Sequence, residues 1–359
     1  MSDGGSSLAT WRDAAKIGSV AAARQTTWPR HAATASFRDM KRVALLSITC
    51  LVGVVACGRE ASVDTPADGR DDTRPGLAGA PSVTVTEDTT SLLFLPFEAA
   101  TTRAFVLDFA NLATSDALSH RYVGWYLDRQ RWVSILDVDS QDEVLREPWR
   151  LFPIDSLRLT VNPDGDPDAL VLLAGNRDHT LELGEPLDRW EDRAGTQHEI
   201  REAIWSQRGQ RVSGVAVQHR FAIPEPEQPA RFGPYERAIL RSEDGAIIVL
   251  FSTREPDIYG DSYAWMYADG LTRRWTALET RTVEVANSTQ LRRNVPIRIW
   301  FRIPEPDIKG ELTAAERQYD ELTTDQGPKP YNALYRVRGW LEFSGERLNV
   351  EGLLERGEP

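Results

Sequence analysis

From residue 82 to the C-terminus, short apolar segments are separated by turn residues every eight to twelve positions. Residues 297–303 show the pattern most clearly, because Ile297, Ile299 and Phe301 alternate with Arg298 and Trp300. A period of two is the signature of a half-buried β-strand, and regularly spaced short strands are typical of all-β proteins. The pattern therefore predicts an all-β body.

Turn residues indicate how several of these strands pair. Asp269-Gly270 separates residues 263–268 from residues 271–275, and this dipeptide tolerates the positive φ of a two-residue hairpin turn. Two further hairpins are predicted, 235–241 with 246–252 and 335–343 with 347–354. The remaining predicted strands are 91–97, 103–109, 121–127, 132–138, 157–161, 169–173 and 212–221.

One segment has a helical signal. Thr313 is followed three residues later by Glu316, which is a capping box, so we expect one short helix near residues 313–323. The whole pattern indicates two packed antiparallel sheets or barrels. The Pro-rich stretch 224–234 divides an N-terminal β domain, 82–230, from a C-terminal β domain, 231–359. A shared Ile-Pro-Glu-Pro motif at 223–226 and 303–306 suggests two units of similar design.

The N-terminal region carries a different pattern. Residues 43–56 are apolar or small, Lys41 and Arg42 precede them, and Cys57 follows. A basic segment, a short apolar run and small residues before the cut describe a secretory signal at 40–56. A cysteine directly after the cut resembles the lipobox of bacterial lipoproteins, which predicts lipidation of Cys57. The alternative is a membrane-spanning helix, but spanning needs about 20 apolar residues and this run is shorter.

The segments around the signal complete this interpretation. Residues 1–39 are too long for a signal n-region, so we interpret them as an extension from a start codon assigned too early, with a transit peptide as the alternative. Residues 57–81 lack apolar periodicity and are predicted to be a flexible tether. Gly58 after the cysteine resembles lipoproteins sent to the outer membrane. We therefore expect export and lipid anchoring to the cell envelope, at an outer membrane facing the periplasm or the surface.

Composition limits the function classes. Without residues 1–56, the chain has 35 Lys and Arg against 51 Asp and Glu, a net charge of −16. Nucleic-acid binding needs a basic footprint, so this class is excluded. Both cysteines, Cys50 and Cys57, belong to the signal and its junction, which leaves the exported body without a disulfide or a thiol nucleophile.

Catalytic motifs are scarce. The chain has no Gly-x-Ser-x-Gly elbow, and the spacing of His120, His179 and His198 with acids repeats no metal pattern. We expect no metal and no cofactor, and the sequence identifies no protein partner. His219 is the one catalytic candidate, because it shares the apolar face of its strand with Val217. It is either a buried histidine with a hydrogen-bond partner or a residue that contacts a ligand.

Several segments in order resemble one family. They are residues 214–219, 235–253, 295–305 and 335–355, within a match that covers about residues 200–357. They are similar to the two-domain lipocalin-like family that contains hydroxyneurosporene synthase, a carotenoid hydratase, and the AttH proteins. The resemblance implies a pair of lipocalin-like barrels that enclose an apolar pocket.

One departure from that family bears on function. Where the family strand has Trp-Met-Asp-His-Glu, this chain has Val217-Gln218-His219-Arg220 and neither carboxylate. Protonation of an alkene carbon needs a strong acid, and neither glutamine nor a neutral imidazole is one. We therefore expect non-catalytic binding of a lipid, isoprenoid or polyene, with a hydratase-like or isomerase enzyme and a scaffolding lipoprotein without ligand as alternatives. The expected ligand-binding residues are His219, Val217, Gln218, Trp265, Trp300 and Trp340.

Overall fold

The computed structural model describes residues 86–98, 104–113, 118–142, 155–161, 167–174, 177–224, 229–322 and 329–359. All of them belong to one compact unit. The extension at 1–39, the signal at 40–56, Cys57 and the tether at 57–81 lie outside the described residues. Within the described ranges, no helix is long and apolar enough to span a membrane.

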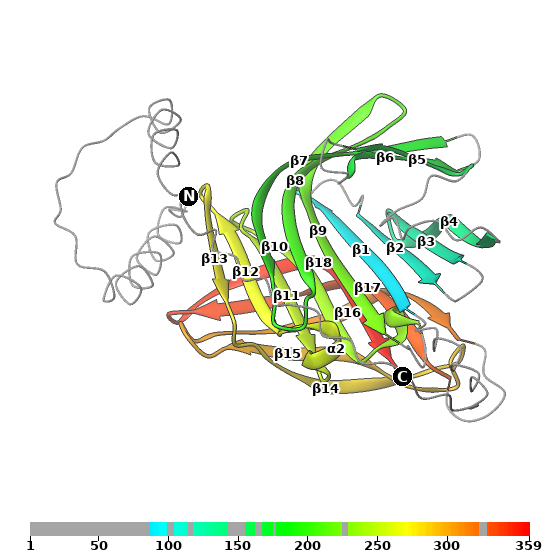
Figure 1. Ribbon diagram of the computed structural model, residues 1–359. Helices are drawn as coiled ribbons and strands as arrows, with labels where there is room; N and C mark the ends of the chain where they lie inside the picture. Colours follow the sequence, from blue (N-terminus) through cyan, green and yellow to red (C-terminus); the bar gives the residue numbers. More distant parts are fainter. Residues whose placement is uncertain are drawn as a thin grey trace, which may run out of the picture. The chain divides into compact units, whose positions relative to one another are not determined.

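The described residues form two antiparallel nine-stranded sheets (Figure 1), so the all-β prediction is confirmed. The strand order is β4-β3-β2-β1-β9-β8-β7-β6-β5 in the first sheet and β13-β12-β11-β10-β18-β17-β16-β15-β14 in the second. The first sheet contains β1 (Thr86–Pro96), β2 (Phe105–Ala113), β3 (Leu118–Asp128), β4 (Arg131–Asp142), β5 (Leu157–Val161), β6 (Pro167–Ala174), β7 (Arg177–Glu191), β8 (Gln197–Gln207) and β9 (Gln210–Pro224). The second contains β10 (Tyr235–Ser242), β11 (Ile247–Thr253), β12 (Tyr263–Ala268), β13 (Leu271–Trp275), β14 (Glu279–Ser288), β15 (Arg293–Ile303), β16 (Ile308–Glu321), β17 (Tyr331–Phe343) and β18 (Glu346–Glu358).

The two sheets repeat one topology, since each first strand pairs with its own last strand, β1 with β9 and β10 with β18. The Ile-Pro-Glu-Pro motifs do not mark this repeat. The first motif begins at the last two residues of β9, which is the last strand of the first sheet in chain order. The second begins at the last residue of β15, which is the sixth strand of the second sheet in chain order. The two halves therefore share a design, but the motif that suggested it occupies non-equivalent strands.

Local turn chemistry fixes the predicted hairpins. Asp269 and Gly270 have φ values of 53° and 76°, and Ser344 and Gly345 have 52° and 82°. Positive φ at both central residues is what a tight turn between twisted strands requires. The hairpins β12–β13, β17–β18 and β10–β11 form as predicted.

The predicted helix at 313–323 is wrong, because residues 308–321 form β16. This strand pairs with β15 on one side and β17 on the other. A capping box contributes about 1 kcal/mol, whereas pairing on both edges satisfies the backbone along the whole strand. Ile308, Gly310 and Leu312 are buried while Lys309, Glu311 and Thr313 are more exposed, and this alternation with a period of two suits a strand. The helical turns in the described chain are α2 (Pro256–Tyr259) and the 3-10 turn η3 (Ala230–Phe232).

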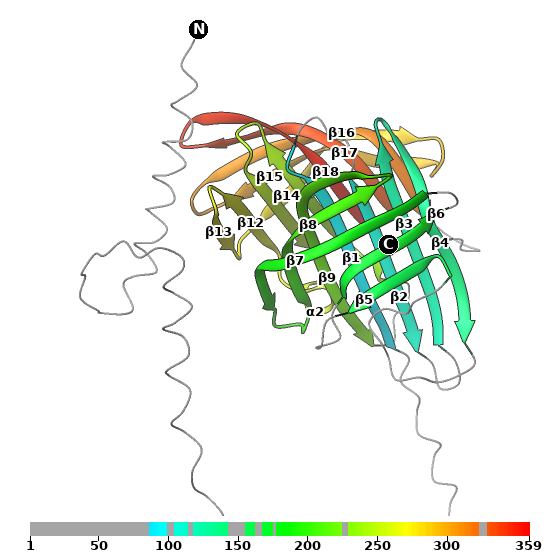
Figure 2. The ribbon, with the colours of Figure 1, turned by 90° about the horizontal axis from the view of Figure 1, so that it is seen from above.

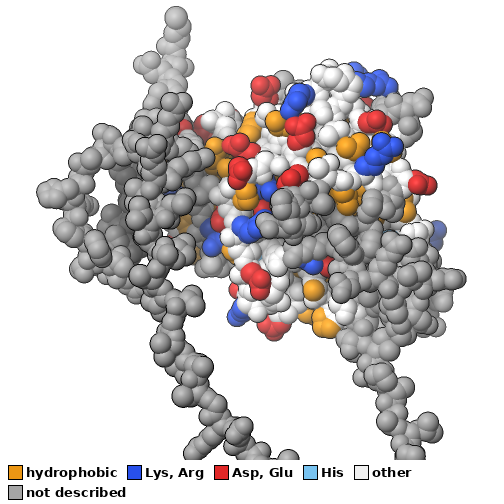
Figure 3. All heavy atoms as spheres, turned by 45° about the horizontal axis from the view of Figure 1, so that its top comes forward, with side chains coloured by type: hydrophobic (Ala, Val, Ile, Leu, Met, Phe, Trp, Pro, Cys, Tyr) orange, Lys and Arg blue, Asp and Glu red, His pale blue; other side chains and the backbone are white. Residues whose placement is uncertain are grey.

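The apolar core has three parts. One fills the first sheet, which curves so that β5 to β7 pass over β1 to β4 (Figures 1 and 2). A second fills the half-barrel of the second sheet. The third lies between them, where β1, β8 and β9 pack against the outer faces of β10, β11, β12 and β18. On the face shown in Figure 3, hydrophobic side chains are scattered among polar and charged ones, as on most protein surfaces.

Candidate functional site

The layer between the sheets contains half of the predicted ligand residues. His219 and Val217 on β9 and Trp265 on β12 are at most 1% exposed, and all three lie in this layer. Gln218 stands between His219 and Val217 in the strand, so its side chain points to the opposite face, toward the interior of the first sheet.

Trp300 and Trp340 lie elsewhere. They face outward from the second sheet, where both are in register with Glu311 on the strand between them. Each ring is covered by an arginine, with Arg281 at 4.4 Å from the Trp300 centroid and Arg347 at 4.1 Å from that of Trp340. The structure therefore does not bring these two tryptophans to His219.

His219 belongs to a buried charged group, which we call the inter-sheet cluster: Ser91, Asp108, His219, Arg237 and Glu355. Arg237 is 1% exposed and Glu355 0%. They face each other because β10 and β18 pair in register at these residues. Arg237 Nε donates to Glu355 Oε2 at 3.0 Å, and Nη2 donates to Glu355 and to the Ser91 hydroxyl. The cluster thus joins strands of both sheets.

The buried ion pair is fully hydrogen-bonded on its acidic side. The second oxygen of Glu355 accepts from the Tyr235 hydroxyl at 3.0 Å and from the Asn332 amide at 2.9 Å. Removing two charges from water is costly unless geometry and hydrogen bonds compensate. Both side-chain oxygens of Glu355 therefore have hydrogen-bond partners, and Arg237 has its acidic partner inside the protein.

The hydrogen bonds fix the protonation of His219. Arg237 Nη1 lies 3.2 Å from His219 Nδ1, and because a guanidinium only donates, Nδ1 must accept. The proton of the neutral ring is therefore on Nε2, which donates to Tyr263 Oη at 2.5 Å. Burial, together with the electrostatic influence of His198 and Arg237, holds the pKa of His219 well below its usual value. His219 is thus a neutral, buried histidine with both nitrogens engaged.

Asp108 is the unusual member of the cluster. Its Oδ1 accepts a hydrogen bond from Ser91 and lies 3.9 Å from Arg237 Nη2. Burial and repulsion by Glu355 raise the pKa of Asp108 from 3.8 to about 7, although Arg237 opposes the shift. One guanidinium cannot neutralise two carboxylates, so the second carboxyl holds its proton close to neutral pH.

A second pair adjoins His219. Asp192 Oδ2 lies 2.8 Å from His198 Nε2, and the His198 ring stands edge-on to the His219 ring with centroids 4.9 Å apart. Burial acts to raise the pKa of Asp192, but hydrogen bonds from His198 and from backbone amides hold it below its usual range. Trp190 stacks on His198 at 4.8 Å. The structure brings His198 together with acid and aromatic neighbours that are close in sequence.

A pocket of about 430 Å³ opens into the first sheet between β4 and the β5–β6 edge. We call it the first-sheet pocket. A β-bulge places both Ile135 and Leu136 in its wall, because Gly124 pairs with Leu136 and Trp125 with Ser134. Its lining comprises Tyr126, Asp128, Val133, Ser134, Ile135, Leu136, Asp137, Val138, Ser156, Leu173, Ala174 and His179. None of the predicted ligand residues is among them.

Known structures share this architecture. An AttH protein from Nitrosomonas europaea matches with a TM-score of 0.48 and 13% identity, over 82% of this chain and 99% of that one. The chain is similar in structure to AttH. Kievitone hydratase from Nectria haematococca matches at 0.46 and 10% identity, and CghA, crystallised with Sch210972, at 0.40 and 11%; each match covers 76% of this chain and 88% of the other.

At identities of 10–13% and TM-scores of 0.40–0.48, these matches are similarities of fold alone. No protein-family model matches the sequence. A search of curated proteins also finds no match.

The sequence pattern did not point to Arg237, Glu355 or Asp108. A signal was present for Asp108, which is a charged residue inside the apolar segment Phe105–Ala113, whereas Arg237 and Glu355 each stand beside another charged residue, Glu236 and Arg356. Such residues are almost never fully buried unless paired. Their pairing, however, depends on the register of β10 with β18 and of β1 with β2, which local alternation does not reveal.

Proposed function

We propose that the protein binds a hydrophobic small molecule, such as a lipid, isoprenoid or polyene, in the first-sheet pocket. The observation that carries this proposal is an opening of about 430 Å³ at a gap between sheet edges, walled by the apolar interior of the sheet. Ligand pockets are typically 300–1,000 Å³ and mostly apolar, with a few polar groups. Its size lies in that range, and its lining combines seven apolar or aromatic residues with five polar ones.

The wall favours a ligand with a flat or extended apolar part. Tyr126 stacks on Trp205 with centroids 5.7 Å apart and planes 16° apart, and His179 stands edge-on to Tyr126 at 5.2 Å. These rings are held by packing, so they offer apolar area at low entropic cost. Ser134, Ser156 and His179 are polar groups within the same lining. A mainly apolar ligand with one hydroxyl or carbonyl group suits this composition.

The proposal is tested with cis-parinaric acid, a fluorescent polyene fatty acid, titrated into the purified protein. We expect saturable fluorescence enhancement that retinol displaces. Ala174→Trp places a large ring in the lining of the pocket and is expected to weaken binding at least tenfold. The matched control, Ala315→Trp, is at an exposed position on β16 outside the pocket and should bind as the wild type does. Unchanged binding by Ala174→Trp would refute the assignment of the site.

We further propose that Cys57 anchors the protein to a bacterial envelope membrane, most simply the outer membrane. The support is the sequence alone: a signal-like segment followed directly by cysteine. Growth with an alkyne-tagged palmitate should label the protein, and Cys57→Ser should abolish the label. Cys50→Ser, which changes the other cysteine, should keep it. Labelling that persists in Cys57→Ser contradicts lipidation at this residue.

A hydratase-like or isomerase activity is the second candidate, and Asp108 is the observation that favours it. The His219 strand lacks carboxylates, yet β2 supplies a carboxyl group whose burial raises its pKa to about 7, within the range useful for a general acid. The Asp108 side chain is 7% exposed, so a substrate must part the sheets to reach it. We therefore rank binding first. Incubation with a polyene decides between them: a product heavier by one water for a hydratase, or one of the same mass but a different chromatographic retention for an isomerase, lost in Asp108→Asn, would establish the enzyme.

A further inference from the structure

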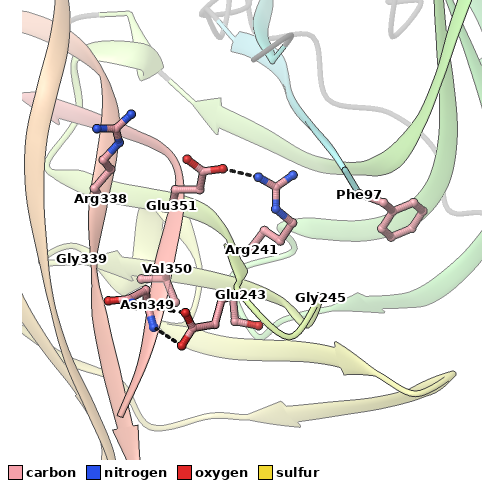
Figure 4. Close-up of a pocket in the computed structure, with 10 residues that line it drawn as sticks. Phe97, Arg241, Glu243, Gly245, Arg338, Gly339, Asn349, Val350 and Glu351 are labelled. Carbon is pink, nitrogen blue, oxygen red and sulfur yellow. Dashed lines mark hydrogen bonds and ion pairs between the residues drawn. The ribbon is translucent and has the colours of Figure 1, made fainter. Parts of the chain in front are cut away.

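A second pocket, of about 480 Å³, lies where the end of β1 meets the second sheet. We call it the seam pocket. Phe97 contributes an aromatic wall, and the other lining residues come from β10, the β10–β11 turn, β17 and β18 (Figure 4). In that view, Phe97 and Arg338 stand at opposite ends, with Arg241 and Glu351 between them. No residue that lines the seam pocket also lines the first-sheet pocket or belongs to the inter-sheet cluster.

Part of the charge in the seam pocket is already paired. Arg241 donates to Glu351 through Nη2 and to the backbone oxygen of Pro96 at 3.1 Å through Nη1. Arg336 Nη2 lies 3.6 Å from the other oxygen of Glu351. Glu351 is therefore held in place between two guanidinium groups, and Arg241 is tied to the end of β1.

The opposite wall is also fixed. The Asn349 side-chain amide donates to Glu243 Oε2 at 3.0 Å, and the backbone amide of Asn349 donates to Oε1 at 3.3 Å. These contacts use the backbone and side-chain nitrogens of Asn349 and leave its side-chain oxygen, Oδ1, as an acceptor. The Glu243 carboxylate can accept further hydrogen bonds, and its donors in these two bonds are neutral amide groups.

Arg338 differs from its neighbours. It is exposed on β17, and its side chain has no hydrogen bond or ion pair within 4 Å to any described residue. Its register partner on β18 is Glu351, whose carboxylate is directed to Arg241 and Arg336 instead. The Arg338 guanidinium, with its five N–H donors, is therefore free to bind a ligand at the edge of the pocket.

From these contacts we propose that the seam pocket binds a neutral, polyhydroxylated ligand, a sugar residue in chemical terms. The pocket lining carries two guanidiniums, Arg241 and Arg338, and two carboxylates, Glu243 and Glu351, so neither an anion nor a cation finds a net complementary charge. A hydroxyl group both donates and accepts, so it can bond to Arg338 and to Asn349 or Glu243. The Phe97 ring offers an apolar face to the C–H side of a sugar ring.

Saturation-transfer NMR on the purified full chain tests the proposal, with methyl β-glucoside and maltose as neutral probes at millimolar concentration. Glucuronate and glucosamine serve as the anionic and cationic counterparts. We expect saturable transfer to a neutral probe and weaker binding of both charged ones. Arg338→Gln should weaken binding about tenfold through loss of a charge-assisted hydrogen bond, and Phe97→Leu should weaken it by removing the ring.

The control is Arg158→Gln, an exposed arginine on β5 outside this pocket, which should leave sugar binding unchanged. Circular dichroism confirms that each variant is folded. Tighter binding of glucuronate or glucosamine than of the neutral probes would overturn the proposal. Absence of saturable transfer to both neutral probes, or binding that Arg338→Gln and Phe97→Leu leave intact, would overturn it too.

Discussion

The raised pKa of Asp108 predicts how stability depends on pH. In the unfolded chain this carboxyl titrates near 3.8, and in the folded protein near 7. Between these values the folded protein holds a proton that the unfolded chain has released, so stability falls as pH rises through this window. The difference of about 3 units corresponds to about 4 kcal/mol over the whole window, at about 1.4 kcal/mol per unit.

Asp108→Asn removes the titration and keeps the shape and an oxygen that accepts from Ser91. Relative to the wild type, the variant should gain stability by about 3 kcal/mol between pH 5 and pH 8, because two units of the window lie in that interval. Urea unfolding followed by tryptophan fluorescence at a series of pH values measures this difference. The gain should appear between pH 5 and 7 and then level off.

The control is Asp137→Asn, whose carboxylate is 66% exposed and pairs with Arg121 at the surface. Solvent screens such pairs, so its stability relative to the wild type should vary little over the same series. A difference between Asp108→Asn and wild type that is flat with pH, or that shifts toward the wild type as the pH rises from 5 to 7, would falsify the assignment of a raised pKa to Asp108.

Other parts of the structure give further expected outcomes, each measured by urea unfolding. Glu355→Gln removes the carboxylate that is hydrogen-bonded to the buried Arg237 and leaves Asp108, 3.9 Å away, as its nearest acidic group, which should cost about 3–5 kcal/mol; a loss below 1 kcal/mol contradicts a desolvated pair. Gly124→Ala places a Cβ 2.8 Å from Leu107 Cδ2 and 2.9 Å from Leu136 Cβ, which should cost about 1–3 kcal/mol through overpacking. Thr313→Val should be neutral within about 0.5 kcal/mol, since Thr313 is an exposed strand residue; a loss of about 1 kcal/mol would indicate a helix cap instead.

Strands were predictable where alternation and turn chemistry agreed. The β12–β13 hairpin needs only an Asp-Gly turn between apolar runs, and both signals are local. β7 was not predicted, although it is 15 residues long. Gly184, Pro186 and several acids interrupt its alternation, and register shifts with β8 flank Pro186. Bulges of this kind move residues out of the period of two, so the pattern of a long strand is lost in the sequence.

The same limit applies to the sites. His219 was identified because it lies on an apolar strand face, but its neighbours Arg237 and Tyr263 come from the other sheet. The first-sheet pocket depends on how closely β4 approaches the β5–β6 edge. Neither feature is a property of one strand.

The sequence by itself determined the all-β class, the tight hairpins and which face of each strand is apolar, because these depend on residues a few positions apart. Only the tertiary structure decided that Asp108, Arg237 and Glu355 share one buried cluster and that residues 313–321 are strand. Register and sheet-on-sheet packing bring together residues more than 100 positions apart, and the dry environment they create sets the charge of each group.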